Sequence, residues 1–94
     1  MSSPEISIEL LESTHEFPGP YTIKVFGPHS QDFLDRVRDT TKAVLMGGEF
    51  DLSFRSSSKG THGCATVDAQ VEDAQQVILL YGELANIDGV RMIL

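Results

Sequence analysis

Two short strands joined by a polar turn, within residues 50–71, constrain the fold of this chain most strongly. Phe50, Leu52 and Phe54 alternate with polar residues, which is the period of two expected of a half-buried strand. The second strand has an apolar residue at every other position: Ala65, Val67, Ala69 and Val71. The polar residues between them favour a reversal, because Gly60 adopts a positive φ at little cost. A hairpin with one apolar face needs a cover, so we expect helices on one side of it.

The length and composition describe one small domain. The chain has 94 residues, 40% of them hydrophobic, which is enough for one packed domain and too little for two. No apolar run approaches the roughly 20 residues that cross a bilayer, and residues 1–12 lack the basic start and apolar centre of a secretory signal. The single cysteine, Cys64, fits a reducing compartment. We therefore expect a cytoplasmic protein.

The chain is acidic, with a net charge of -7 from fourteen acidic and seven basic side chains. This charge repels phosphate backbones and anionic lipid, so we expect neither a nucleic acid nor a membrane as partner. Residues 1–20 form an acidic N-terminal arm that contains no Lys or Arg. Ile6, Ile8 and Leu10 alternate as in an edge strand, whereas Leu10 and Leu11 beside acids suit a short helix. An arm that docks late is the third alternative.

The remaining residues predict the order strand, helix, strand, strand, helix, strand. The first strand covers residues 21–27, and a helix from Gln31 to about Met46 follows, with Ser30 as its N-cap. A second helix begins near Asp73, and residues 90–94 form a last short strand. This order predicts an α+β, ferredoxin-like βαββαβ domain over residues 21–94. Its four-stranded antiparallel sheet carries two helices on one face, and its first and third strands are central.

The other face of this sheet is left open. Lys24 and Asp68 are expected there as neighbours on adjacent central strands, where opposite charges attract. On the second helix, Leu79 points away from the inner stripe, and Ile78 lies on its flank. The two residues form a second contact patch unless the N-terminal arm folds over them. The predicted partner surface therefore consists of Lys24, Phe26, Arg55, Asp68, Ile78, Leu79 and Arg91.

Two polar turns are candidate ligand sites. The hairpin tip combines several hydroxyls, backbone amides and one lysine, which can hold a small anion. The turn at residues 27–30 precedes the first helix, where free amides and the helix dipole favour a carboxylate. An ordinary polar hairpin and an ordinary capped turn explain the same residues. The candidate ligand-binding residues are Gly27, His29, Ser30, Ser57, Ser58, Lys59 and Gly60.

The sequence gives no pattern for a metal, a cofactor or a catalytic centre. His62 and Cys64 share one strand face, but zinc needs four positions, and only the distant His15 and His29 could add to them. No base lies near Cys64 in the sequence to activate its thiol. A chain this short also has little interior for a deep pocket. We therefore expect no metal, no cofactor and no enzymatic activity.

Three segments together resemble a known family. Residues 16–27 (EFPGPYTIKVFG), the turn at residues 57–60 (SSKG), and the ending LYGEL with VRMIL are similar to the YbeD-like family. These are small uncharacterised bacterial proteins, sometimes labelled lipoate-regulatory, and the resemblance covers roughly residues 10–94. It implies a βαββαβ domain similar to ACT-type regulatory domains, without an activity or catalytic residues. The chain differs in its longer acidic arm and in Ile78, Leu79 and Gly82, where polar residues are more typical.

These observations lead to two functional hypotheses. The first is a regulatory or adaptor domain that acts by protein contact, through the open sheet face, the flank of Ile78 and Leu79, or both. Formation of a homodimer through sheet faces or sheet edges would bury what the helices leave exposed. The alternative is an ACT-like sensor of an amino acid or another small carboxylate, bound near residues 27–30 or at a dimer seam. An enzyme ranks below both.

Overall fold

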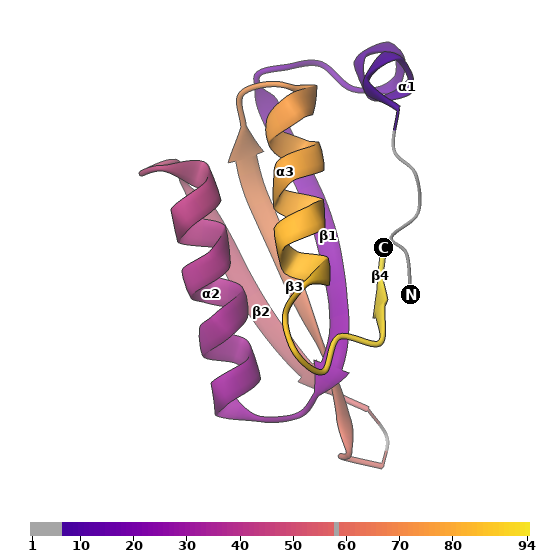
Figure 1. The fold of residues 1–94 in the computed structure, drawn as a ribbon, viewed down its shortest axis with the longest axis vertical. Helices are drawn as coiled ribbons and strands as arrows, with labels where there is room; N and C mark the ends of the chain where they lie inside the picture. The colour runs from indigo at the N-terminus through magenta and orange to yellow at the C-terminus, as the bar shows by residue number, and fades with distance from the viewer. Residues whose placement is uncertain (1–6, 58) are drawn as a thin grey trace.

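The computed structural model describes residues 7–57 and 59–94. Its elements, in chain order, are α1 (Ile8–Thr14), β1 (Gly19–Pro28), α2 (Gln31–Leu45), β2 (Phe50–Ser56), β3 (His62–Val71), α3 (Ala74–Ala85) and β4 (Met92–Ile93) (Figure 1). The predicted βαββαβ order is confirmed from β1 onward, and α1 precedes it. No helix within the described residues is long and apolar enough to cross a membrane.

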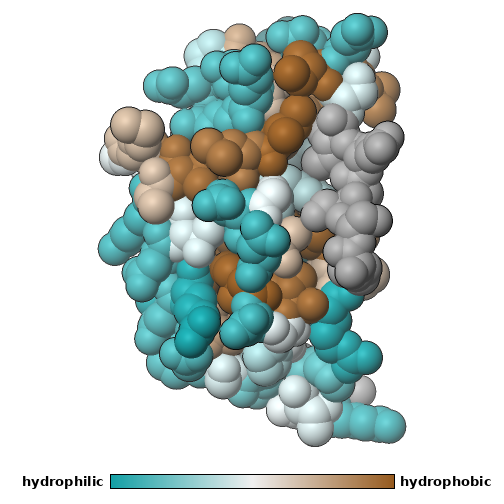
Figure 2. Space-filling view, viewed as in Figure 1, coloured by the Kyte–Doolittle hydropathy of each residue, from teal (hydrophilic) through white to brown (hydrophobic). Residues whose placement is uncertain are grey.

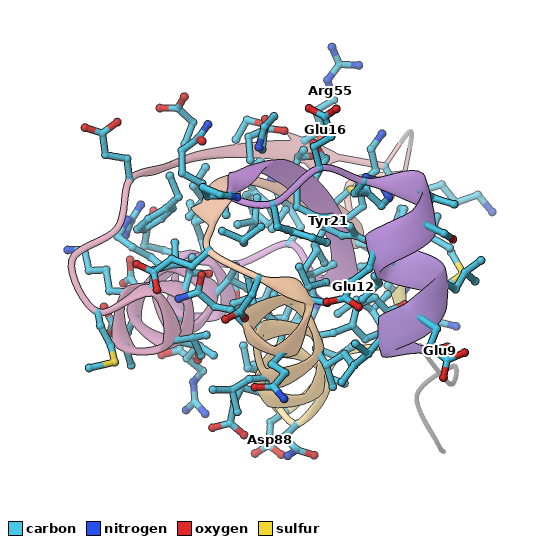
Figure 3. All side chains as sticks on the ribbon, turned by 90° about the horizontal axis from the view of Figure 1, so that it is seen from above. Glu9, Glu12, Glu16, Tyr21, Arg55 and Asp88 are labelled. Atoms are coloured by element: carbon cyan, nitrogen blue, oxygen red, sulfur yellow. The ribbon has the colours of Figure 1, made fainter. Side chains whose placement is uncertain are left out.

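The four strands form one antiparallel sheet in the order β2-β3-β1-β4, so the first and third strands are central, as predicted. β1 pairs with β3 along its whole length, from Gly19 opposite Val71 to Pro28 opposite His62. β4 adds only a two-residue pairing at the far side of β1. Both α2 and α3 pack on the same face of this sheet (Figures 1 and 3). The expected arrangement, with one covered and one open face, is therefore confirmed.

The core lies between the two central strands and the two helices. Its fully buried residues alternate along the strands and recur at helical spacing: Ile23, Val25, Ala65, Val67, Ala69, Phe33, Val37, Val77, Leu80 and Leu84. The edge strand β2 is less well covered. Its inward residues Phe50, Leu52 and Phe54 are only half-buried, because α2 and α3 lie over the central strands and make little contact with β2. The sheet is thus densely packed at its centre and thinly covered at the β2 edge.

Local side-chain chemistry fixes the helix ends. At α2, the Ser30 hydroxyl oxygen accepts a hydrogen bond from the Phe33 amide at 3.1 Å, the predicted N-cap. At α3, the Asp73 carboxylate accepts from the Gln76 amide at 2.8 Å. The helix α2 ends at Leu45, close to the expected end, and Met46 caps it in the left-handed conformation, with φ of 50°, one residue before the glycines expected there. The Met46 side chain is 87% exposed as a result.

The N-terminal segment contributes a short helix. Among the three alternatives for the acidic arm, residues 8–14 form the helix α1, which Ser7 caps and which contacts α3. Its Leu11 is 5% exposed and joins the core. Ile6 lies outside the described residues. β1 begins at Gly19, two residues before the predicted strand, with Pro20 near its exposed start, where a missing amide proton is tolerated.

A buried hydroxyl holds the short strand β4. The Tyr81 hydroxyl donates a hydrogen bond to the Ile93 carbonyl at 2.8 Å. Next to it, the backbone of Leu94 exchanges two hydrogen bonds with the backbone of Lys24 in β1, at 3.0 and 2.9 Å. The antiparallel alternation therefore turns the Ile93 carbonyl away from β1, toward the outer edge. Burial, and secondarily the nearby Tyr21, raise the pKa of Tyr81 above its ordinary value of 10.0.

We expect Tyr81→Phe to lower the free energy of unfolding by about 1–3 kcal/mol, because the Ile93 carbonyl loses its donor. Because folding raises the pKa of Tyr81, its neutral hydroxyl stabilises the folded state. This stabilisation is complete below pH 10.0, the ordinary pKa, and is lost as the pH rises through the higher folded-state pKa. Urea denaturation should be measured above and below pH 10.0 for Tyr81→Phe and for Tyr21→Phe, the matched control. The free energy of unfolding should fall less with rising pH in Tyr81→Phe than in Tyr21→Phe. Equal losses would contradict this role of Tyr81.

Candidate functional site

The open face of the sheet is a grid whose rows follow the strand register. The row nearest the hairpin turn consists of Arg55, Cys64, Phe26 and Met92, the next of Ser53, Thr66 and Lys24, and the third of Asp51, Asp68 and Thr22. Every one of these side chains is exposed or half-buried. Arg55 points away from the helices (Figure 3). The surface predicted from strand alternation therefore exists, and Lys24 and Arg91 both reach solvent.

Charges of opposite sign separate along this face. Three of the seven basic residues lie on α2, where Arg36 and Arg38 pair with Asp32 and Asp35 at 3.0 and 2.9 Å. The other four lie on the open face or at the turn beyond it: Lys24, Arg55, Lys59 and Arg91. The opposite end of the face carries acidic residues: Glu49, Asp51 and Asp68. An acidic chain thus presents a local cationic region at the hairpin end of its sheet.

Lys24 and Asp68 lie on the same face of the adjacent central strands, as expected, but diagonally, so they do not face each other. Thr22 lies directly opposite Asp68 and donates a hydrogen bond to its carboxylate at 2.5 Å, while Lys24 lies opposite Thr66. The two ion pairs found within residues 7–57 and 59–94 are both on α2. On its other side, Asp68 faces the like-charged Asp51 of β2. The acidic end of the face is therefore uncompensated within the chain's described part.

An open hollow of about 340 Å³ lies at the cationic end, lined by Phe26, Gly27, His62, Arg91 and Met92. The Arg91 guanidinium contacts the Nε2 atom of His62, and the Nδ1 atom of that ring lies 3.1 Å from the Thr61 hydroxyl. Because a guanidinium only donates, Nε2 is the acceptor in this contact. Phe26 and Met92 add apolar side chains to the same lining. A cation beside apolar side chains suits a carboxylate attached to an apolar group.

The turn at residues 27–30 is mainly structural. Ser30 uses its hydroxyl oxygen to cap α2, and the His29 ring stacks against Phe54 with centroids 5.2 Å apart. A Cβ atom on Gly27 would lie 2.5 Å from the ring of Phe33, so glycine is needed here for packing. Gly27 also lines the hollow, whereas His29 and Ser30 do not. The structure thus brings one of these three predicted ligand residues to the hollow.

At the hairpin tip, two of the backbone amides expected to bind an anion serve the turn itself. The Ser57 amide donates to the His62 carbonyl at 2.7 Å, and the Gly60 amide donates to the Ser57 carbonyl at 2.9 Å. Gly60 has the expected positive φ, at 71°. Lys59 is exposed, and Ser58 lies outside the described residues. The tip and the turn at residues 27–30 lie at the same end of the molecule (Figure 1).

The histidines considered as distant metal ligands lie elsewhere. His15 packs against Tyr21, with ring centroids 4.9 Å apart, and His29 packs against Phe54. Neither joins His62 and Cys64. Within the described residues, no three His, Cys, Asp or Glu side chains are grouped in a way that could hold a metal ion.

A second apolar area lies on the helix side. Leu79 is 55% exposed and lines a hollow between α3 and α2, together with Asp39, Thr40, Ala43, Val44, Met46 and Glu83. Figure 2 shows a band of hydrophobic residues across this side of the molecule. Ile78 is half-buried and packs against the core instead. The predicted patch therefore divides: Leu79 stays exposed although α1 contacts α3, and Met46 joins it.

Sequence reasoning missed Met92 and Met46. Met92 alternates with the buried Ile93, so its place on the open face was readable from the alternation in the last strand. Its closeness to His62 was not readable, because Met92 lies on β4 and His62 on β3, and β1 lies between these strands and sets their distance. Met46 was expected near the end of the helix, and its exposure follows from the left-handed conformation in which it caps α2.

Residues 12–94 match the family described as protein of unknown function, DUF493. The chain belongs to this family. Similar DUF493-type sequences include a UPF0250 protein of Pasteurella multocida, which is 39% identical over 84 residues, covering 89% of this chain and 94% of the relative. The UPF0250 protein YbeD of Salmonella arizonae is 35% identical over 79 residues, covering 84% and 90%. The resemblance to the YbeD-like family is confirmed, and these names state no activity.

Two solved structures share the fold of this DUF493 protein. The solution structure of protein HP0495 from H. pylori superposes with a TM-score of 0.75 at 16% identity, over 86% of each chain. The ACT domain from the GTP pyrophosphokinase of Chlorobium tepidum gives a TM-score of 0.57 at 12% identity, over 80% of this chain and 94% of that domain. The ferredoxin-like, ACT-like fold is confirmed, and the function has to be argued from the open face.

Proposed function

We propose that this chain is a non-catalytic regulatory or adaptor domain that binds another protein through the hairpin end of its open sheet face. One observation carries the proposal: the four basic residues outside α2 lie on this face or at the turn beyond it, in a chain of net charge -7. Selective placement of cations favours a partner with complementary acidic residues. Phe26 and Met92 between these cations favour an apolar side chain in the same partner segment.

The shape of the face supports a protein partner over a small ligand. The hollow is open to solvent, and its rim continues into flat rows of exposed side chains such as Lys24 and Arg55. Small-ligand pockets, in contrast, bury most of the ligand surface. An extended peptide can contact both the hollow and the rows. The exposed Leu79 and Met46 offer the same partner a second apolar contact on the helix side.

A small-carboxylate sensor is the second candidate. It is favoured by Arg91, which lines the same hollow as the apolar Phe26 and Met92, with Gly27 also in the lining. An amino acid or another small carboxylate would place its anionic group on Arg91. This candidate needs fewer contacts than a protein partner and predicts a response confined to the hollow.

Amide chemical shifts can test the two candidates in one experiment. We expect a short acidic peptide with a central leucine to shift the amides of Phe26, Arg55 and Arg91, and a basic peptide of the same length to shift none. Arg91→Ala should weaken the binding about tenfold, and added salt should weaken it further. Arg36→Ala, which removes an exposed arginine of α2, is the matched control and should leave binding unchanged.

The outcomes separate the candidates. A response to amino acids or lipoate-related acids around Gly27 and Arg91, without a response to the acidic peptide, would support the sensor and contradict the protein-binding proposal. The absence of shifts with both kinds of ligand would remove both candidates. An equal loss of binding in Arg36→Ala and Arg91→Ala would indicate a general charge effect instead of a site on the open face.

A further inference from the structure

The two edges of the sheet differ. At one edge, β4 is two residues long, and the Tyr81 hydroxyl occupies its outward Ile93 carbonyl. At the other edge, β2 is seven residues long and contains no proline. Within residues 7–57 and 59–94, no strand pairs with the outer side of β2, and no helix contacts it extensively. A long, regular and uncovered edge of this kind is a template for pairing with another strand.

The hydrogen bonds to β3 show which backbone groups of β2 point outward. The Gln70 amide donates to the Glu49 carbonyl at 2.9 Å, and the Ser57 amide donates to the His62 carbonyl at 2.7 Å. Residues 49 and 57 thus bond inward, toward β3. Because bonded positions alternate along an antiparallel ladder, residues 51, 53 and 55 also bond inward. The outward amides and carbonyls belong to the remaining residues: Phe50, Leu52, Phe54 and Ser56.

We propose that β2 pairs antiparallel with β2 of a second copy of this chain, across a two-fold axis at Ser53. The outward groups fall on even-numbered residues, so only symmetric registers centred near residues 52, 53 or 54 pair several of them. With the axis at Ser53, all four outward residues are paired: Phe50 with Ser56 of the second copy and Leu52 with Phe54, each in both directions. The neighbouring registers pair three of them with one another and set the fourth opposite a residue outside the strand.

The side chains match in the same register. On the open face, Asp51 lies opposite Arg55 of the second copy, and symmetry repeats the pair. These are non-hydrogen-bonded positions, where facing side chains are closest. Within its own chain Asp51 faces only the like-charged Asp68, so the second copy supplies the missing cation. On the helix side, the half-buried Leu52 and Phe54 meet across the axis and cover each other's exposed edges.

Exchange of the two charges gives a test specific to this register. Sedimentation up to about 1 mM protein should show a reversible dimer for the unchanged chain. Arg55→Asp and Asp51→Arg each replace two attractive pairs by two repulsive ones, so each should raise the dissociation constant about tenfold or more. The double variant restores opposite charges and should return to within about threefold of the unchanged chain. Arg36→Asp, on α2, makes the same change in net charge as Arg55→Asp and should have no effect.

A cross-link tests the axis directly. With Cys64 replaced by serine, Ser53→Cys places two thiols across the axis, where Cα atoms about 4.5 Å apart lie within disulfide range. Mild oxidation should join the two copies quickly. Thr22→Cys, exposed on β1 of the same face, is the control and should join only slowly. All positions altered on β2 are exposed, so the amide spectrum of each variant should remain that of the folded chain.

The proposal fails if the unchanged chain sediments as a monomer up to about 1 mM. It also fails if a single charge reversal leaves the dimer intact, if the double variant is no better than the single ones, or if Ser53→Cys joins no faster than Thr22→Cys. An axis at Leu52 would set Glu49 against Arg55, and the charge exchange would not restore it. The dimer does not depend on the partner binding proposed above, because Arg91→Ala should leave it unchanged.

Discussion

Replacement of Leu80 by alanine is expected to lower the free energy of unfolding by about 2–5 kcal/mol, the largest effect of any single change considered for this chain. The Leu80 side chain is 0% exposed and belongs to the core between α3 and the sheet. Its truncation removes apolar contacts and leaves a cavity that the closely packed strands cannot fill. Urea denaturation monitored by circular dichroism would measure the loss.

The adjacent residue provides the control. Leu79 has the same side chain one position earlier in α3, but it is 55% exposed. Leu79→Ala should therefore change the free energy of unfolding by no more than about 0.5 kcal/mol. Similar losses at both positions would mean that α3 does not present Leu80 to the sheet, and the covered and open faces would then have to be reassigned.

The second large effect is expected from Gly27→Ala, which should lower the free energy of unfolding by about 1–3 kcal/mol. The new Cβ atom would lie 2.5 Å from the ring of Phe33. Because Phe33 is 2% exposed and held within the core, its ring has no free space to enter. For a domain of this size each lost kcal/mol lowers the midpoint of thermal unfolding by about 4–8 °C. A thermal melt would therefore detect the change easily.

Gly82 is the matched glycine. It lies inside α3, and no atom lies within 4 Å of the position that a Cβ would take. Gly82→Ala should stabilise the protein by about 0.5–1 kcal/mol, because alanine loses less backbone freedom in a helix. Full stability of Gly27→Ala together with loss of a bound carboxylate would show that Gly27 serves the hollow more than the packing.

Features that depend on neighbours in the sequence were predictable. The period-two pattern of residues 50–54 and 65–71 was enough to place the hairpin, and Ser30 and Asp73 marked the helix starts through hydrogen bonds to amides three residues on. These signals are local, since each depends on one strand's alternation or one helical turn. Together with the connection rules for sheets they determined the order of the strands.

Features that depend on distant segments were not predictable to the same degree. The diagonal placement of Lys24 and Asp68 was not predictable, because strand alternation specifies the face of a residue but not its partner in the next strand. The hollow joins residues from β1, β3 and β4, and its existence depends on the relative offset of all three. Ile78 packs against the core, whereas Leu79 lines the hollow beside α2. This difference depends on how α2 and the core are placed around α3.

If copies of this chain pair through β2 as proposed, the hydrogen bond from Tyr81 to Ile93 limits how far they can assemble. A sheet that is available for addition at both ends can grow without limit, as in a fibre, whereas one that accepts a neighbour at a single end stops at a pair. Because the outward Ile93 carbonyl of the two-residue β4 already accepts from Tyr81, it is not free to bind an added strand. Loss of this hydroxyl would therefore expose the protein to chain-like polymerisation as well as to unfolding.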